Sequence, residues 1–137
     1  ISKKSINVSK INAKLLNLSN RAKFFHSSID NFNSGKYDLI VSNPPYIELL
    51  NLKYLEKDVV NFEPKLALNG GLDGFSKIKI VICKASGLIK KKGKLILEIG
   101  FNQKNKVKEM LKKQGFYVNH TFRDHGNNDR CIISTKI

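Results

Sequence analysis

"YDLIVSNPPYI", residues 37–47, is the stretch that decides the fold class. Its first six residues form a nearly continuous run of β-favouring, largely apolar side chains, as in strands that are buried on both faces of a parallel sheet. Asn43, Pro44 and Pro45 follow directly, and neither proline has a backbone N–H to donate to a neighbouring strand. The sequence therefore predicts a buried strand over residues 37–42 that ends on a rigid turn.

Outward from this strand, helical and strand patterns alternate along the chain. Strands are expected at residues 22–26, 37–42, 94–99, 116–122 and 131–135, and helices at residues 2–18, 75–89 and 104–114, with a short helix inside residues 49–62. Strands that alternate with helices of this length predict one α/β domain with a βαβ-type sheet. The short loop between the last two strands predicts an antiparallel pair at the end of the chain.

The ends of these helices carry their own signals. Ser2 is expected to cap the first helix, and its apolar positions share one face: Val8, Ile11, Leu15 and Leu18. Gly93 and Gly115 are expected as left-handed caps that end the next two helices. Residues 63–74 contain one proline and three glycines, which predicts a shaped loop, and Asp73 is expected to cap the helix that follows it.

The composition indicates a globular protein with a basic surface. The chain has 137 residues and a formal net charge of +14, and 22 of its 25 basic residues are lysines. This charge predicts weak, non-specific attraction to acidic partners such as RNA. No apolar run approaches the roughly 18 residues that a membrane span needs, so a cytoplasmic protein without a membrane partner is expected. Cys83 and Cys131 show no metal-ligand spacing and are expected to be free thiols, and no metal site is predicted.

The turn that ends the strand over residues 37–42 offers a particular chemistry. In open α/β sheets, ligands bind beyond the carboxyl ends of the parallel strands. There, Asn43 brings a side-chain oxygen, Pro44 a carbonyl that no local N–H pairs, and Tyr46 a flat aromatic face. Two acceptors and a ring suit a planar group that carries an NH2. Because such a nitrogen gains positive charge as it is alkylated, the pattern predicts alkylation of an amide or an exocyclic amine.

Four blocks of the sequence resemble one enzyme family. "DLIVSNPPYI", "FEPKLALNGGLDG", "GKLILEIG" and "RDHGNNDR" together are similar to the release-factor glutamine N5-methyltransferases of the HemK type. This resemblance implies a Rossmann-like sheet of seven strands and S-adenosylmethionine as methyl donor. It also implies that the acceptor is the glutamine of the Gly-Gly-Gln loop in class 1 peptide release factors.

Carried over residue by residue, the resemblance implies roles for six positions. The Asn43 side chain and the Pro44 carbonyl would accept from the glutamine amide, with Pro45 as a wall and Tyr46 as a packing face. Asn43 would also contact the methionine end of the donor. Ser27 and Ser28 stand at the turn that contacts the adenine in the family, which makes these two serines candidate donor contacts.

The chain also departs from the family pattern. It has neither the glycine-rich loop after the family's first strand nor the acidic residue that ends the second, and Ile1–Lys3 match the positions just after that acidic residue. Residues 1–137 are therefore expected to form the C-terminal part of a single catalytic domain, with the first two strands missing. Alone, this polypeptide is expected to bind S-adenosylmethionine poorly.

Two other functions are compatible with parts of the sequence. Asn-Pro-Pro-Tyr also occurs in adenine-N6 methyltransferases that act on DNA or RNA, although the block over residues 62–74 argues against that activity. A basic RNA-binding module without catalytic activity is the third possibility. Asp124, Asp129 and Arg130 are expected to tie the last turn together by ion pairing, and Glu98 either lines the site or is a buried, hydrogen-bonded carboxylate.

Overall fold

The computed structural model describes residues 2–137 and divides the chain into two compact units, residues 1–33 and residues 34–137. Among the described residues, no helix is both long enough and apolar enough to cross a membrane.

Residues 1–33 contain helix α1 (Lys3–Leu15) and the 3₁₀ helix η1 (Ile29–Asn31). Ser2 caps α1 as predicted, since its side chain accepts a hydrogen bond of 3.2 Å from the backbone N–H of Ser5. The strand expected at residues 22–26 is wrong, because the chain is irregular there. A strand is defined by hydrogen bonds to a neighbour, and among residues 2–137 no strand pairs with this segment.

The expected apolar face of α1 is present at Val8, Ile11 and Leu15, whereas Leu18 lies beyond the end of the helix. Val8, Ile11 and Leu15 are all exposed, and Ala13 is the buried residue of the helix. The periodicity of this helix therefore does not correspond to a core within the described residues.

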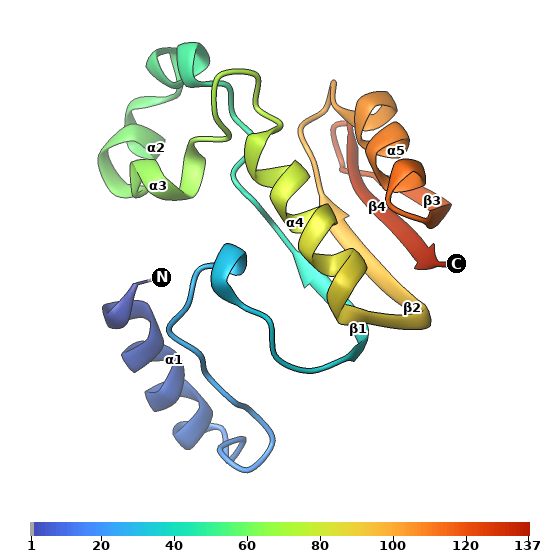
Figure 1. Ribbon diagram of the computed structural model, residues 1–137. Coiled ribbons are helices and arrows are strands. Elements are labelled where there is room, and N and C mark those ends of the chain that lie inside the picture. The colour runs from blue at the N-terminus through green and yellow to red at the C-terminus, as the bar shows by residue number, and fades with distance from the viewer. Residues whose placement is uncertain (1) are drawn as a thin grey trace. The chain divides into compact units, whose positions relative to one another are not determined.

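Residues 34–137 contain a mixed sheet of four strands in the order β1-β2-β4-β3 (Figure 1). Its strands are β1 (Tyr37–Ser42), β2 (Ile89–Glu98), β3 (Phe116–Arg123) and β4 (Asp129–Lys136). Strands β1 and β2 are parallel, with Ser42 opposite Leu97, whereas β4 is antiparallel to both β2 and β3. The predicted α/β class and the antiparallel pair at the end of the chain are confirmed.

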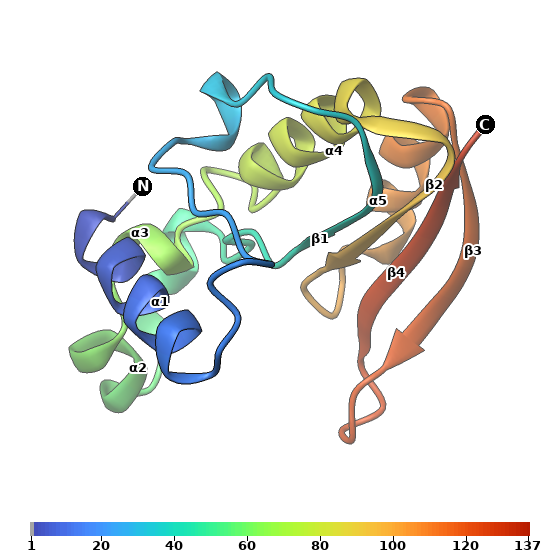
Figure 2. The same ribbon diagram turned by 90° about the horizontal axis from the view of Figure 1, so that it is seen from below.

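Two longer helices, α4 (Ser76–Leu88) and α5 (Lys104–Lys113), cover one face of this sheet (Figures 1 and 2). The predicted cap of α5 is confirmed, because Gly115 adopts a φ of +73°. Between β1 and α4 the chain forms a helical excursion beyond the carboxyl end of β1, which consists of η2 (Leu49–Tyr54), α2 (Lys57–Phe62) and α3 (Lys65–Leu68) (Figure 1).

The core lies between the two helices and the sheet. Its fully buried aliphatic and aromatic side chains come from both helices, from β2 and the residue that follows it, and from β3 and β4: Ile78, Ile82, Leu95, Leu97, Ile99, Val107, Leu111, Phe116 and Ile132. The apolar positions at helical spacing in α4 and α5 therefore point inward, and burial of this apolar surface is what holds residues 34–137 together.

Strand β1 has the predicted bounds, but the prediction that both of its faces are buried is wrong. Leu39 and Val41 are 51% and 66% exposed, whereas Ile40, between them, packs against the core. The reason is that β1 is an edge strand among the described residues and that α4 covers only one of its faces.

The expected role of Gly93 as a helix cap is also wrong. Helix α4 ends at Leu88, Ile89 already belongs to β2, and Lys92, not Gly93, takes a positive φ. A Cβ at Gly93 would lie 2.9 Å from Ile89 Cγ1 and 3.0 Å from the carbonyl oxygen of Asp38. Glycine is needed here because β1 and the turn within β2 approach closely.

This crowding predicts opposite effects for two glycine substitutions. Gly93→Ala forces the neighbouring backbone apart and should lower the free energy of unfolding by about 1–3 kcal/mol. Gly87→Ala, in α4, meets no atom within 4 Å. It should raise the free energy of unfolding by about 0.5–1 kcal/mol, because it improves helix propensity. Urea unfolding of the two variants measures both changes, and destabilisation by both would contradict this explanation.

Candidate functional site

The Asn-Pro-Pro-Tyr segment leaves the sheet where β1 and β2 end side by side. Pairing of β1 with β2 stops at Ser42, one residue before Asn43. Pro44 is buried, Pro45 and Tyr46 are half-buried, and Asn43 is exposed. The rigid turn predicted from the sequence therefore lies at the carboxyl end of a parallel strand pair, which is where ligands bind in sheets of this kind.

Three acceptor groups of this segment, the carbonyl oxygens of Pro44 and Pro45 and the Asn43 side chain, have no hydrogen-bond partner among the described residues. A hollow of about 380 Å³ lies beside them and is lined by Asn43, Pro44, Pro45, Tyr46, Ile47, Glu63, Ala67 and Leu68. The segment thus presents oxygen acceptors to a space of the size that a side-chain amide and its flanking backbone need.

The loop over residues 69–74 is what holds the far end of this segment in place. The Gly70 N–H donates to the Ile47 carbonyl at 2.8 Å, and the Ile47 N–H donates to the Leu68 carbonyl at 3.2 Å. A further bond of 2.9 Å runs from the Leu49 N–H to the Gly71 carbonyl. The glycine-rich block and the Asn-Pro-Pro-Tyr segment therefore form one hydrogen-bonded unit.

The glycines of that loop are required by this close approach. A Cβ at Gly70 would lie 2.8 Å from both the Cα and the carbonyl carbon of Tyr46, which is closer than real Cβ contacts allow. Gly71 has a φ of +96°. Its N–H donates to the Asn69 side chain at 2.8 Å. The sequence predicted a shaped loop over residues 63–74, and the structure gives the reason for these two glycines.

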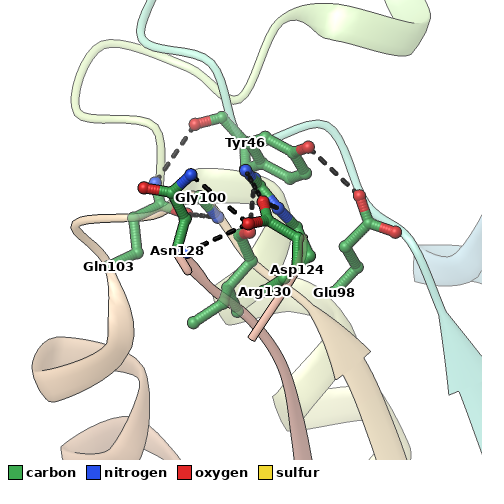
Figure 3. Close-up of polar contacts among 8 residues, drawn as sticks. Tyr46, Glu98, Gly100, Gln103, Asp124, Asn128 and Arg130 are labelled. Atoms are coloured by element: carbon green, nitrogen blue, oxygen red, sulfur yellow. Dashed lines mark hydrogen bonds and ion pairs between the residues drawn. The ribbon is translucent and has the colours of Figure 1, made fainter. Parts of the chain in front are cut away.

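Tyr46 is fixed at its phenol end (Figure 3). Its hydroxyl donates a hydrogen bond of 3.1 Å to Glu98 at the end of β2. Burial, followed by the neighbouring Glu98 carboxylate, raises the pKa of the Tyr46 phenol, and Arg130 opposes this shift. The phenol therefore stays neutral and its ring keeps a defined orientation. Glu98 is hydrogen-bonded, as one of its two expected roles requires, but it is half-buried and not buried.

Arg130 joins this group to the turn between β3 and β4 (Figure 3). It forms an ion pair of 2.9 Å with Asp124 and donates a bond of 3.2 Å to the carbonyl of Ile99. Hydrogen bonds from the Asn128 N–H and from Arg130 lower the pKa of the Asp124 carboxyl. Asp129 pairs in turn with Lys104 at 3.0 Å. The structural role expected for Asp124, Asp129 and Arg130 is confirmed.

Gln103 belongs to the site but was not found from the sequence. Its side chain is 3% exposed and bonds to three segments of backbone. Its Oε1 accepts from the Gly100 N–H at 2.9 Å, and its Nε2 donates to the carbonyls of Tyr46 at 3.1 Å and Gly74 at 3.2 Å (Figure 3). The one signal in the sequence was a polar residue three positions after Gly100, directly before the helix that begins at Lys104.

Other predicted residues lie outside this cluster. Ser27 and Ser28 belong to residues 1–33, and the Ser27 hydroxyl donates to the Ser28 carbonyl at 2.9 Å. Their contact with the adenine of the donor stays a prediction. Asp73 accepts from the Phe75 N–H at 3.0 Å, although α4 begins one residue later, at Ser76. Cys83 and Cys131 are free thiols, as expected.

The fold and the position of the strand-end site define a methyltransferase-like α/β protein. Among solved structures, the chain is similar to the ribosomal protein L11 methylase from Lactobacillus delbrueckii subsp. bulgaricus, with a TM-score of 0.67 and 19% identity, covering 100% of this chain and 56% of that one. It is also similar to TrmN from Thermus thermophilus, with a TM-score of 0.62 and 17% identity, covering 99% of this chain and 34% of that one. These likenesses confirm the predicted Rossmann-like methyltransferase fold.

The chain belongs to the Eco57I restriction-modification methylase family, whose model matches residues 1–103. Curated relatives agree with the resemblance found in the sequence. The chain is 39% identical over 132 residues to the release factor glutamine methyltransferase of Buchnera aphidicola subsp. Schizaphis graminum (strain Sg), covering 96% of this chain and 47% of the relative. It is 36% identical to the bifunctional methyltransferase of Rickettsia typhi (strain ATCC VR-144 / Wilmington), covering 96% of this chain and 26% of the relative. The chain thus spans half or less of the length of these relatives.

The lowered pKa of Asp124 predicts an acid-sensitive turn. The pKa of Asp124 in the folded state lies below the ordinary value of about 3.9. The ionised carboxylate therefore contributes fully to the free energy of unfolding above that pH, and this contribution is lost as the pH falls through the folded-state pKa. The free energy of unfolding of the unmodified protein should therefore exceed that of the Asp124→Asn variant from pH 7 down to about pH 5, and the difference should shrink toward pH 3. Urea unfolding at each pH measures it. A difference that stays constant to pH 3 would contradict the assignment.

Proposed function

We propose that the natural protein carrying this chain transfers a methyl group from S-adenosylmethionine to the side-chain amide nitrogen of the glutamine in the Gly-Gly-Gln loop of class 1 peptide release factors. The observation that carries this proposal is the open set of acceptors at Asn43 and Pro44, beside a hollow at the end of a parallel strand. The names of the Buchnera relatives, both release factor glutamine methyltransferases, support the choice of acceptor.

The acceptor amide fits this segment by its hydrogen-bonding capacity. A glutamine side chain offers two N–H groups, and the Asn43 oxygen and the Pro44 carbonyl offer two acceptors on a backbone that Pro45 stiffens. The face of Tyr46 packs against the planar amide. Pro44 and Tyr46 therefore act with Asn43 in holding the nitrogen in one orientation, and such orientation supplies a large part of the rate in transfers of this kind.

The same groups suit the charge that develops during transfer. S-adenosylmethionine supplies an electrophilic methyl group on a positively charged sulfur. The nitrogen lone pair forms the new N–C bond while the S–C bond breaks. The electron pair of the S–C bond stays with the sulfur, and the amide nitrogen becomes positive. The carbonyl dipoles of Asn43 and Pro44 stabilise that charge, and the nitrogen then loses a proton to water. No ionised base among the residues of the segment is required.

Part of the donor site is also proposed within this chain. Asn43 would contact the methionine end of S-adenosylmethionine from the exposed strand end. Ser27 and Ser28 are half-buried and bring hydroxyl groups that accept from the adenine amine. The hydrogen-bonding chemistry of these residues fits the donor. The partners proposed for the protein are class 1 release factors, with weak and non-specific RNA contact from the net charge of +14, in the cytoplasm.

An adenine-N6 methyltransferase is the second candidate, and the match to the Eco57I methylase model over residues 1–103 favours it. The exocyclic amine of adenine presents the same two N–H groups as a glutamine amide, so the acceptors of Asn43 and Pro44 do not separate the two. An enzyme of this kind must extrude its base into the pocket, which needs an additional recognition element for the nucleic acid.

The two candidates are separated by offering both acceptors to the natural protein. Labelled S-adenosylmethionine is supplied with a class 1 release factor, with its Gln→Ala loop variant, or with DNA and RNA. The proposal expects label on the unmodified release factor and none on the loop variant. Label on nucleic acid with the release factor untouched would instead support the adenine-N6 function.

Replacement of Asn43 tests the role of the strand end in this reaction. Asn43→Ala removes one of two dipoles that face the developing charge, and a loss of about 10²–10³ in kcat is expected. Asn105→Ala, an exposed residue of α5, is the matched control and should leave kcat within a factor of two. An Asn43→Ala variant with the kcat of the control would remove Asn43 from the site.

A further inference from the structure

The Asn-Pro-Pro-Tyr segment, the loop over residues 69–74 and the end of β2 meet at one buried side chain. The Gln103 carboxamide satisfies a backbone group in each: the carbonyl of Tyr46, the carbonyl of Gly74 and the N–H of Gly100. Tyr46 and Gly74 lie 57 and 29 residues away along the chain.

We infer that Gln103 is a positioning residue for the proposed transfer, because it sets the location of the Asn-Pro-Pro-Tyr segment against the loop over residues 69–74. It does not touch the acceptor. It acts through the Tyr46 backbone, which is one peptide unit from Pro45 and two from Pro44. This inference rests on the proposed function only for its kinetic consequence.

The chemistry of the position calls for an amide. One acceptor and two donors are used, and the amide is the one uncharged side-chain group that provides all three at this length. A carboxylate at the same place would keep the bond from Gly100, but it would face the two carbonyls without a hydrogen to donate. Because Gln103 is 3% exposed, water cannot replace the lost bonds.

Two glycines next to Gln103 leave the space that its side chain occupies. A Cβ at Gly74 would lie 2.9 Å from Gln103 Nε2 and 2.7 Å from the Tyr46 carbonyl oxygen. A Cβ at Gly100 would lie 3.1 Å from Gln103 Oε1. Two of the glycines in the family-like blocks therefore leave room for this one amide, in agreement with a built position rather than a chance contact.

Gln103 and Glu98 fix the two ends of Tyr46 in different ways (Figure 3). Glu98 holds the phenol, which orients the ring, whereas Gln103 holds the main-chain carbonyl, which places the segment that carries Pro44 and Pro45. Loss of Gln103 should thus displace the acceptor groups themselves. A displacement of about 1 Å is enough to slow a transfer reaction by about 10²-fold.

The first test follows the segment without any substrate. Gln103→Glu is compared with Gln114→Glu, the same change at an exposed glutamine that ends α5, in the natural protein. Hydrogen exchange is measured at the amides of Ile47 and Gly70, which join the two segments, and at Leu97 in the centre of the sheet. Gln103→Glu should speed exchange at Ile47 and Gly70 at least 10-fold and at Leu97 less than 3-fold, whereas the control should leave all three unchanged.

Two outcomes of the exchange measurement would overturn the inference. Equal acceleration at Ile47, Gly70 and Leu97 would mean that Gln103 supports only the global stability of the fold. Unchanged exchange at all three would mean that Gln103 places nothing. If Gln103→Glu does not fold, Gln103→Met keeps the buried volume without a charge or a hydrogen bond, and the same comparison is made with it.

The second test measures kcat and asks whether a lower pH restores part of the activity of Gln103→Glu. Gln103→Glu should lower kcat for release-factor methylation about 10- to 100-fold and leave the KM for S-adenosylmethionine within about 3-fold. The introduced carboxyl regains a donor when it is protonated, and burial raises its pKa, so the kcat of this variant relative to the unmodified protein should recover in part as the pH is lowered from 8 to 6. A flat ratio, or an equal loss for Gln114→Glu, would contradict the inference.

The two tests separate the inference from the proposed function. If the unmodified protein methylates no release factor, the proposed function fails, and the exchange measurement still decides whether Gln103 places the segment. If the release factor is methylated and Gln103→Glu has the kcat of the control, the inference alone fails.

Discussion

The candidate site depends on the hydrogen bond between the Gly70 N–H and the Ile47 carbonyl, because that bond joins the two segments from which the site is built. One segment leaves the sheet after β1 and cannot continue it, since prolines occupy two of its positions. The other returns toward α4 as a glycine-rich loop. Each has little regular structure of its own. Their mutual bonds, and the absence of side chains at Gly70 and Gly74, allow the Tyr46 backbone to lie in a fixed place. This arrangement fixes the position of the acceptors of Asn43 and Pro44. The apolar core between the sheet and helices α4 and α5 holds the strands from which the two segments extend.

The neighbours of Tyr46 extend this constraint into the rest of residues 34–137. Glu98, at the end of β2, and Gln103, directly before α5, form hydrogen bonds with Tyr46. Arg130, in β4, interacts electrostatically with Tyr46 and donates a hydrogen bond to the carbonyl of Ile99. Glu98 and Arg130 come from segments whose resemblance to one family was visible in the sequence as separate blocks, whereas Gln103 lies outside those blocks. The structure explains why such blocks occur together, because each supplies a contact to the same short turn. The blocks over residues 62–74 and 93–100 therefore both contact the strand end over residues 43–46.

Features that depend on neighbouring residues in the sequence were predictable, whereas features that depend on contacts between distant segments were not. The bounds of β1 were predicted correctly because two prolines end a strand by local chemistry, and Gly115 was predicted correctly because a left-handed cap is a local requirement. The strand expected at residues 22–26 failed because pairing depends on a neighbour, not on the segment itself. Gly93 was misread because close approach and positive φ both call for glycine, and the sequence does not separate them. Gln103 was missed because its role exists only where three segments meet, up to 57 residues apart.

The central claim is that the strand end at Asn43 and Pro44 holds the amide that is methylated. It is tested most directly by a crystal structure of the natural protein with S-adenosylhomocysteine and a release-factor peptide that contains the Gly-Gly-Gln loop. The glutamine amide nitrogen should lie about 2.7–3.2 Å from both the Asn43 side-chain oxygen and the Pro44 carbonyl oxygen, against the face of Tyr46. A peptide bound elsewhere, with the strand end free, would contradict the account. A flipped adenine at the strand end, in a parallel complex with nucleic acid, would contradict it as well.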